Sequence, residues 1–422
     1  MVEGARPGRR CDRPWGHEPD DPHRRSRRSG GHGDPAAARP GRRAPRANRR
    51  AQGGRQIAPL DFFFLTDGGQ NADAIAQRLA SFLDGATKTL DVAIYDLRLD
   101  QSPSAMVFNS FESAVKRGVA VRLIFNQDHA EAIPVPPPPE IDWAFVDRLR
   151  SAGVQIKPVP GVPDLMHHKY VVRDAGMPAP AVLTGSTNWT NDSWSREENV
   201  MVTVESGDIA ADFAANFKEL WDKPVVAMSG RISSPWSTLA DGIQVRPYFC
   251  PGRSLKLVHA MSRSIASARK RIRICSPVIT SGPILGTLAE VVEHGGVDIS
   301  GVYDATQMDE VLHQWGSQGG AAWKIAAFRS IIGAVHFGAK RSTPYAKGST
   351  HDFMHAKILV TDDYVYTGSF NLSHSGESNA ENVMQIESAA VADMCVAYID
   401  RVAARYGAPP ARMRAGTPVD VP

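Results

Sequence analysis

The chain has 422 residues, of which 42% are apolar and 22% are charged, a composition typical of a globular protein with two or three domains. No run approaches the ~20 consecutive apolar residues needed to cross a bilayer, which excludes a membrane-spanning protein. The four cysteines are far apart and include no C-x-x-C pair, so neither a disulfide framework nor a cysteine-based zinc site is indicated.

The net charge of +3 conceals an uneven distribution. Residues 1–55 contain 15 Arg, no Lys and 6 acidic residues, whereas residues 56–422 contain 33 basic and 39 acidic residues, a net charge of −6. The first segment also lacks Leu, Ile and Phe, so we predict a disordered tail. Such a tail could bind nucleic acid or an anionic membrane, but a merely solvated tail, or a start codon placed too early, is favoured. Because it has no apolar signal core, we expect a cytoplasmic protein.

After this tail, apolar periodicity predicts two series of helices and strands in the same order. Ile75, Leu79 and Phe82, for example, recur at helical spacing. The expected elements are a helix over 72–84, a strand over 89–97, a helix that ends at Arg117-Gly118 and a strand over 119–125, followed by a helix over 255–268, a strand over 271–279, a helix over 284–296 and a strand over 297–304.

Strands that alternate with helices predict the α/β class, here two similar α/β/α domains, each with a mixed, mostly parallel sheet flanked by helices. A solenoid is excluded because the repeat is several times longer than the ~20–50 residues of such arrays. The predicted organisation is the tail at 1–55, a first domain at 56–222, a linker at 223–245, a second domain at 246–410 and a tail at 411–422.

The duplication is clearest in two short stretches, LMHHKYVVRD at 165–174 and FMHAKILVTD at 353–362. Both contain H-x-K-x4-D, and all three motif residues recur at an offset of 188. The motif residues are His167, Lys169 and Asp174 in the first copy and His355, Lys357 and Asp362 in the second.

Two further matches follow at an offset of 183. GSTN at 185–188 matches GSFN at 368–371, and Glu198-Asn199 matches Glu381-Asn382. The change of offset places five extra residues of the first copy between the two motifs, where Gly and two prolines indicate a turn tip. We therefore expect a longer loop with undisturbed flanking strands.

Alternate side chains of a strand share one face, so His167 and Lys169 should point together and His168 away from them. The residue equivalent to His168 is Ala356, which argues against a chemical role for His168. The motif aspartates fall on the opposite face, and we interpret Asp174 and Asp362 as turn or structural residues.

The repeated residues suit chemistry on a phosphodiester. Lysines neutralise non-bridging oxygens, and Ser and Asn donors share the developing charge. One histidine can attack phosphorus while the other protonates the leaving oxygen and then activates water. Each Glu is placed to accept from a histidine Nδ1–H. No metal-ligand set is apparent, so we expect no metal or other cofactor. The alternative is a duplicated binding module that has lost turnover.

At these residues the sequence resembles the phospholipase D superfamily, whose signature is a doubled H-x-K-x4-D motif followed by G-S-x-x-N. The resemblance covers about residues 58–406 and implies two domains about a pseudo-twofold axis with one active site at their junction. It marks His167, Lys169, His355 and Lys357 as catalytic, Glu198 and Glu381 as histidine orienters, Ser186, Asn188, Ser369 and Asn371 as phosphate-binding, and Asp174, Asp362, Gly185 and Gly368 as structural. It favours His167 as the nucleophile.

The resemblance indicates a reaction type rather than a substrate. GSFNLSHSGESNAEN at 368–382 looks like the branch of bacterial nucleases and mitochondrial cardiolipin hydrolases, but the acidic charge of residues 56–422 argues against DNA. We predict hydrolysis or transfer of a phospholipid head group through a phosphohistidine, by a monomer because both half-sites are in one chain. A metal-independent nuclease and a silent phosphodiester-binding protein are the alternatives. Solvated or packing roles are expected for the unrepeated histidines His129, His313, His336, His351 and His374.

Overall fold

The computed structural model describes residues 59–127, 141–317, 319–335, 337–345 and 349–407. These residues belong to one compact unit, Gln56–Pro422. The tails predicted at 1–55 and 411–422 lie outside the described residues.

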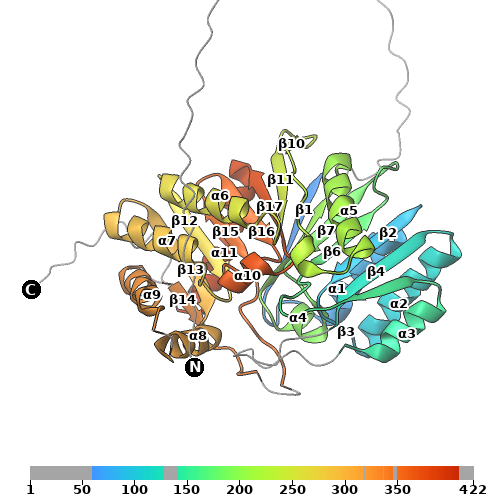
Figure 1. The fold of residues 1–422 in the computed structure, drawn as a ribbon, viewed down its shortest axis with the longest axis horizontal. Helices are drawn as coiled ribbons and strands as arrows, with labels where there is room; N and C mark the ends of the chain where they lie inside the picture. The colour runs from blue at the N-terminus through green and yellow to red at the C-terminus, as the bar shows by residue number, and fades with distance from the viewer. Residues whose placement is uncertain (1–58, 128–140, 318, 336, 346–348, 408–422) are drawn as a thin grey trace, which may run out of the picture. The chain divides into compact units, whose positions relative to one another are not determined.

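The first half of the described chain forms a seven-stranded sheet in the order β1-β9-β7-β6-β2-β4-β5 (Figure 1). Strands β3 and β8 form a separate, two-stranded parallel sheet. The elements are β1 (Leu60–Leu65), α1 (Ala72–Asp84), β2 (Thr89–Ile94), β3 (Leu97–Arg98), α2 (Gln101–Lys116), β4 (Ala120–Asn126), α3 (Trp143–Ser151), β5 (Gln155–Val159), β6 (Lys169–Arg173), β7 (Ala181–Gly185), β8 (Trp189–Thr190), α4 (Asn191–Ser195), β9 (Asn199–Val204) and α5 (Gly207–Asp222).

The second half forms an eight-stranded sheet, within the described residues, in the order β10-β11-β17-β16-β15-β12-β13-β14. Its elements, with the preceding 3₁₀ turn, are η1 (Val226–Met228), β10 (Ser237–Thr238), β11 (Gln244–Phe249), α6 (Ser254–Ser267), β12 (Arg271–Ser276), α7 (Gly282–His294), β13 (Asp298–Asp304), α8 (Ala305–Ser317), α9 (Ala322–Ala334), β14 (Phe337–Lys340), β15 (Ile358–Thr361), β16 (Tyr364–Gly368), α10 (His374–Ser378), β17 (Asn382–Glu387) and α11 (Ala389–Arg405).

The eight elements predicted from periodicity are all present, with small differences in their ends. Helix α1 starts where the Asn71 side chain accepts a hydrogen bond from the backbone N–H of Ala74, a standard N-cap. Its buried side chains, including Ile75 and Leu79, form the apolar stripe seen in the sequence. The strand expected over 89–97 instead ends at Ile94, and Leu97 begins the separate strand β3.

Both sheets are mixed, as predicted, but the expectation that they are mostly parallel is wrong. In the first sheet β2 pairs with β4 and β4 with β5 in parallel, while β1, β9, β7, β6 and β2 pair successively in antiparallel fashion. The second sheet repeats this arrangement around β12. The reason is that each motif strand returns through a hairpin, which joins antiparallel strands, whereas only helical crossovers give parallel pairs.

The hairpin between the motif strands contains the predicted insertion. Strand β6 ends at Arg173 and β7 begins at Ala181, whereas β15 and β16 are separated by only Asp362 and Asp363. The extra residues therefore lengthen a turn and leave the ladder on either side intact.

Three apolar cores lie between the sheets and the helices that pack on them. One lies between the first sheet and helices α1, α2 and α3, and another between the second sheet and helices α6, α7 and α9. The central core contains side chains of both sheets and of α5 and α11, including Phe213 and Tyr398. The Tyr398 hydroxyl donates to the carbonyl of Leu65 at 2.8 Å, so α11 of the second half is attached to β1 of the first. The two halves share one interior.

The segment predicted as a linker, 223–245, has structure of its own. It contains η1 and β10, and its last two residues begin β11, so the second sheet starts before residue 246. Among the described residues no helix combines the length and apolarity required to span a bilayer. The cytoplasmic location stays a prediction.

Candidate active site

The two H-x-K motifs lie at the junction of the halves, and each is bonded to the other half through its backbone. Met166 forms an isolated parallel bridge with Ala380, and Glu198 forms the equivalent bridge with Met354. The backbone N–H of His167 donates to the Ala380 carbonyl at 2.9 Å, and that of His355 to the Glu198 carbonyl at 3.1 Å. The two histidines are thus held by equivalent crossed contacts, in keeping with a pseudo-twofold relation.

The contact predicted between Glu381 and a histidine is present, and it crosses the junction. His167 Nδ1 lies 2.7 Å from Glu381 Oε1, so the Nδ1–H group donates to the carboxylate. In the neutral ring Nε2 then carries no proton. The second carboxylate oxygen accepts from the Ser369 hydroxyl at 2.5 Å. That hydroxyl in turn accepts from the backbone N–H of Asn382 at 3.0 Å, so the glutamate is held in one orientation.

His355 has a different partner. Its Nδ1 lies 3.1 Å from Asn199 Oδ1, and Glu197 Oε2 is 3.4 Å away. The Asn199 amide is oriented by its own donors, because Nδ2 donates to Glu197 Oε2 and to the Ser193 carbonyl. The Ser186 hydroxyl also donates to Asn199 Oδ1, at 2.6 Å. A carboxamide therefore occupies the place that a carboxylate occupies beside His167.

The prediction that Glu198 orients a histidine is wrong. Its carboxylate accepts from Lys340 Nζ and from the Tyr406 hydroxyl, both at 2.6 Å, and it is completely buried. The reason is a register difference of one residue: Asn199 follows Ser186 by 13 positions, whereas Glu381 follows Ser369 by 12. Asn199, and not Glu198, is therefore the structural equivalent of Glu381, although the letters Glu-Asn match in the two sequences.

Lys169 and Lys357 lie beneath the histidines and are almost fully buried. Each ammonium donates to the carbonyl of the histidine two residues earlier, at 2.8 Å for Lys169 and 2.6 Å for Lys357. Burial lowers the pKa of Lys169 to about 7 and that of Lys357 well below its usual value. Burial, followed by the charges of both lysines, also holds the pKa values of His167 and His355 well below 6.5.

Of the four residues predicted to bind phosphate, only the asparagines line the cavity. The Oδ1 atoms of Asn188 and Asn371 are buried and have no hydrogen-bond partner within the described chain. Ser186 and Ser369 are fully buried, and their hydroxyls are engaged with Asn199 and Glu381. The serines therefore position the histidine partners, and the asparagine amides are the groups presented to a ligand.

The motif aspartates contact the backbone outside the cavity, as expected for structural residues. Asp174 accepts from the N–H groups of residues 87–89, and Asp362 from those of residues 269–271. Burial acts to raise the pKa of Asp174, but these backbone donors outweigh it and hold the pKa below its usual value. Gly185 is required because a Cβ there would lie 2.1 Å from the Val200 carbonyl, and Gly368 meets Asn382 in the same way.

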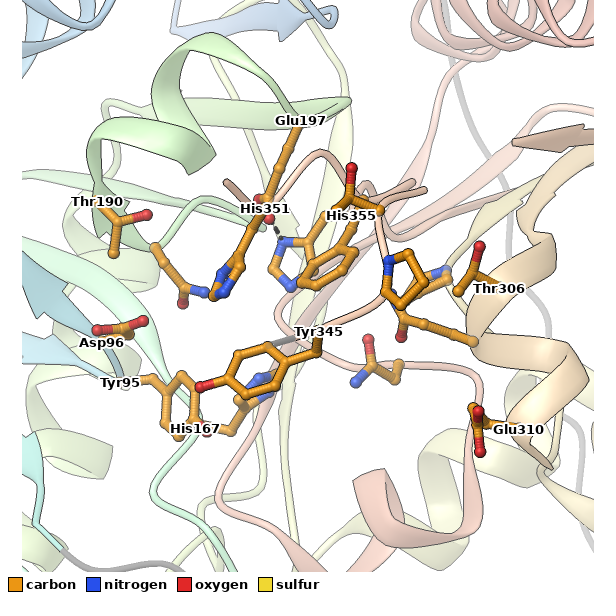
Figure 2. A pocket seen from close by; sticks show the side chains of 17 residues that line it. Tyr95, Asp96, His167, Thr190, Glu197, Thr306, Glu310, Tyr345, His351 and His355 are labelled. Carbon is orange, nitrogen blue, oxygen red and sulfur yellow. Dashed lines mark ion pairs between the residues drawn. The ribbon is translucent and has the colours of Figure 1, made fainter. Parts of the chain in front are cut away.

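A cavity of about 270 Å³ opens above the two histidines. Figure 2 shows His351 and His355 near Glu197 on one side, with Tyr95, His167 and Tyr345 below them in this view. The Tyr95 ring meets the His167 ring edge-on at 4.6 Å, and His351 stacks on Phe353 at 5.0 Å. The acidic residues of its lining are Asp96, which is paired with Arg98, Glu197 and Glu310. No cluster of three or more His, Cys, Asp or Glu residues in the described chain could hold a metal ion.

A family model described as "Cardiolipin synthase, PLD-like domain" matches the chain twice, at residues 79–221 and 261–403. Each match contains one H-x-K motif and the G-S-x-N sequence that follows it, GSTN in the first and GSFN in the second. The chain belongs to the phospholipase D superfamily. The internal duplication predicted from the motifs is thereby confirmed, and each phospholipase D-like repeat corresponds to one of the two sheets with its helices.

Relatives of this phospholipase D-like chain include mitochondrial cardiolipin hydrolases. The protein from Chlamydomonas reinhardtii is 25% identical over 145 residues, covering 34% of this chain and 56% of the relative. That from Xenopus laevis is 29% identical over 154 residues, covering 36% and 64%, and the Homo sapiens protein is 26% identical, covering 36% and 53%. The matches thus span between half and two thirds of these relatives.

Two solved structures share the fold over most of the chain. A phosphatidylserine synthase from Haemophilus influenzae superposes with a TM-score of 0.57 at 14% identity, covering 82% of this chain and 86% of that one. A polyphosphate kinase from Porphyromonas gingivalis gives a TM-score of 0.51 at 13% identity, covering 80% and 50%. At these identities the similarity establishes the two-domain fold of the superfamily.

Sequence reasoning missed three residues of this phospholipase D-like site. Asn199 and Glu197 face His355, and the available signal was the sequence Glu197-Glu198-Asn199, whose registration against the second copy is ambiguous by one residue. The sequence predicts a solvated or packing role for His351, because it has no counterpart in the other half, but in the structure His351 lines the cavity. A residue unique to one copy cannot be found by comparing the copies.

Proposed function

We propose that the protein is a phosphodiesterase that cleaves a phospholipid head group through a phosphohistidine on His167. The observation that carries the proposal is the unequal pairing of two histidines at one cavity. Glu381 lies beside His167 and, in its ionised form, can stabilise the positive charge that the ring acquires on bonding to phosphorus; burial raises the pKa of Glu381 to about 8, so this carboxyl also accepts a proton readily. The closest partner of His355 Nδ1 is the neutral amide of Asn199, and Glu197 Oε2 is farther away at 3.4 Å, so a proton is retained less strongly on this ring.

In the first step His167 Nε2 forms a bond to phosphorus while the bond from phosphorus to the leaving oxygen breaks. His355 donates its proton to that oxygen, which leaves as an alcohol. Lys169, Lys357 and the amides of Asn188 and Asn371 supply positive charge and donors for the non-bridging oxygens. The products of this step are the free head-group alcohol and a phosphohistidine.

In the second step His355, now neutral, accepts a proton from water as the water oxygen bonds to phosphorus. The N–P bond breaks, and His167 returns to its starting state with Glu381 at Nδ1. Since the intermediate awaits an acceptor, a small alcohol can replace water, so hydrolysis and transfer are outcomes of one mechanism.

Three observations support a lipid substrate. The family model and the curated relatives are named for cardiolipin synthesis and hydrolysis, residues 56–422 carry a net charge of −6, and Glu197 and Glu310 are among the residues that line the cavity. Negative charge around the site disfavours a long polyanion such as DNA. Nuclease activity and silent phosphodiester binding are the competing functions.

The test is turnover by the purified chain on phosphatidylcholine vesicles, cardiolipin vesicles, and single- and double-stranded DNA, with and without ethanol. We expect release of phosphatidate from lipid, partial diversion to phosphatidylethanol, and persistence of both in excess chelator. Cleavage of DNA without lipid turnover would assign the site to a nuclease. Binding of lipid and DNA without any product would show a silent site.

A further inference from the structure

A second cavity, of about 590 Å³, lies in the second half and shares no lining residue with the active-site cavity. It is formed by residues 232–234, strand β11 and helix α6. Its polar lining includes Arg246, Arg253, Lys256, His259, Ser262 and Arg263, and no acidic side chain of the described chain lines it. This cavity is therefore lined by positively charged side chains, although residues 56–422 together carry a net negative charge.

The cationic side chains are gathered by helix geometry. Lys256, His259 and Arg263 follow one another at intervals of three and four residues, so they share one face of α6. Arg253 immediately precedes the helix, and Arg246 reaches the cavity from β11. Two elements of different type therefore direct their positive charges into the same space.

These charges are not neutralised by the protein. Within the described residues no ion pair of 4.0 Å or less includes Arg246, Arg253, Lys256 or Arg263. Buried Arg273, by contrast, contacts both Asp298 and Asp400. Asp212 interacts with Ser234 on one wall, but it does not line the cavity. Unpaired like charges repel one another, and an anionic ligand relieves that repulsion.

Arg246 is held in place for such a ligand. Its Nη2 donates to Gln385 Oε1 at 2.7 Å, and its guanidinium packs on the rings of Trp236 and Tyr248 at 4.5 and 4.9 Å. With the side chain fixed, Arg246 Nε remains without a hydrogen-bond partner, as does the hydroxyl of Ser262. A prearranged, unsatisfied donor lowers the entropy cost of binding an acceptor.

We propose that this cavity is a second, noncatalytic anion site that binds the dianionic phosphate group of a phosphomonoester. Four positively charged side chains and two unpartnered polar atoms match a compact group with two charges and three exposed oxygens. A phosphodiester carries one charge and fewer free oxygens, so it binds more weakly. The concavity favours a discrete group over a flat membrane or a long nucleic acid.

Isothermal titration of the full chain tests the proposal. The probes are inorganic phosphate, glycerol 3-phosphate and dimethyl phosphate, and phosphatidate vesicles test a lipid source of the same group. Lys256 and Arg263 are exposed, so the variant Lys256→Gln/Arg263→Gln should fold, with Lys256→Gln alone as the fallback. Lys88→Gln/Lys223→Gln, at exposed positions outside the cavity, is the control with the same change of charge.

We expect the Lys256→Gln/Arg263→Gln variant to bind glycerol 3-phosphate at least tenfold more weakly, while the control stays within twofold of wild type. Dimethyl phosphate should bind wild type at least tenfold more weakly than glycerol 3-phosphate. Turnover of a small phosphodiester should be unchanged in both variants, so the result is independent of the proposed function. Identical titrations for all three proteins, equal binding of dimethyl phosphate, or loss of binding only to vesicles or DNA would each overturn the proposal.

Discussion

The two histidine sites of this molecule have equivalent backbones and unequal chemistry. Both histidines receive a backbone contact from the other half, and both have a lysine beneath them. Yet His167 faces the Glu381 carboxylate at 2.7 Å, whereas His355 faces the Asn199 carboxamide at 3.1 Å. Duplication supplied two copies of one scaffold, and a difference at one strand position distinguishes the roles that we propose for the two histidines.

The distinction follows from what each partner does to a proton. A carboxylate stabilises a cationic ring, as the proposed bond from His167 to phosphorus requires. The closest partner of His355 is a neutral carboxamide, and Glu197 lies farther away at 3.4 Å, so His355 can more readily give up a proton and regain it. The comparison can be tested by changing the histidines, their partners, the pH and the neighbouring buried ion pair.

The largest effect is expected from removing the histidines. His167→Ala should lower kcat/KM by about 10³-fold or more with any leaving group, because the nucleophile is lost. His355→Ala should be as damaging for an alkyl leaving group but much less so for 4-nitrophenolate, which leaves without a proton. His168→Ala is the matched control and should retain most activity, because its buried ring lies away from the cavity. If each variant lost kcat/KM equally with both leaving groups, His355 would not be the proton donor and the two histidines would not have the proposed separate roles.

Changing the partners should give the next largest effect. Glu381→Gln should lower kcat by about 10²-fold, because the ring that becomes cationic loses its carboxylate. Asn199→Asp should change kcat by less than tenfold, since His355 and the Ser186 hydroxyl can still donate to an oxygen at this position, although the Nδ2 contacts with Glu197 and Ser193 are lost. Steady-state kinetics of both variants on one substrate provide the comparison, and a larger loss for Asn199→Asp would reverse the assignment.

The pH dependence should be displaced toward acid. Burial and then the two lysines hold the pKa values of His167 and His355 well below 6.5. Turnover needs one ring neutral and the other protonated, so lowering both pKa values moves both limbs of the kcat/KM profile to lower pH. We therefore expect an optimum below pH 6.5, measured from pH 4 to 8.5. An optimum at pH 7.5 or above would indicate that the histidines keep higher pKa values.

The smallest effect on chemistry is expected at Glu198, whose role is structural. Its buried carboxylate binds Lys340, so Glu198→Gln should lower the free energy of unfolding by about 3 kcal/mol. Because Glu198 faces neither histidine, kcat of the folded protein should remain within a few-fold of wild type. Urea unfolding and kinetics on the same preparation separate the two quantities. A loss of kcat as large as that of Glu381→Gln would show that Glu198 takes part in catalysis, as the sequence predicted.

The sequence was sufficient for the fold class and for the paired motifs because both depend on periodicity and spacing. His167, Lys169, His355 and Lys357 lie at the junction because two hairpins with the same pattern fold in the same way and each motif bonds to the other half. The one-residue displacement that exchanges Glu198 for Asn199 was not predictable, since the adjacent letters matched equally well. The strand directions differ from the expected mostly parallel sheet because a short hairpin after each motif joins antiparallel strands, and a helical crossover alone does not reveal it.

Site residues that are not part of the internal repeat could not be predicted from the repeated motifs. His351 and Tyr345 reach the active-site cavity from a segment with no equivalent in the first half. The basic cavity beside α6 depends on which charges find partners, and that is decided by packing. Sequence composition gave only the overall negative charge of residues 56–422.

The most direct test of the unequal histidines is to locate the covalent intermediate. A phosphodiester labelled at phosphorus is mixed with the wild-type chain and with His355→Ala, quenched within milliseconds in alkali, which preserves phosphohistidine, and the peptides are mapped. We predict label on the peptide containing His167 in both proteins when the leaving group is 4-nitrophenolate. Label on the His355 peptide of the wild type, or no protein-bound label while product accumulates, would contradict the account.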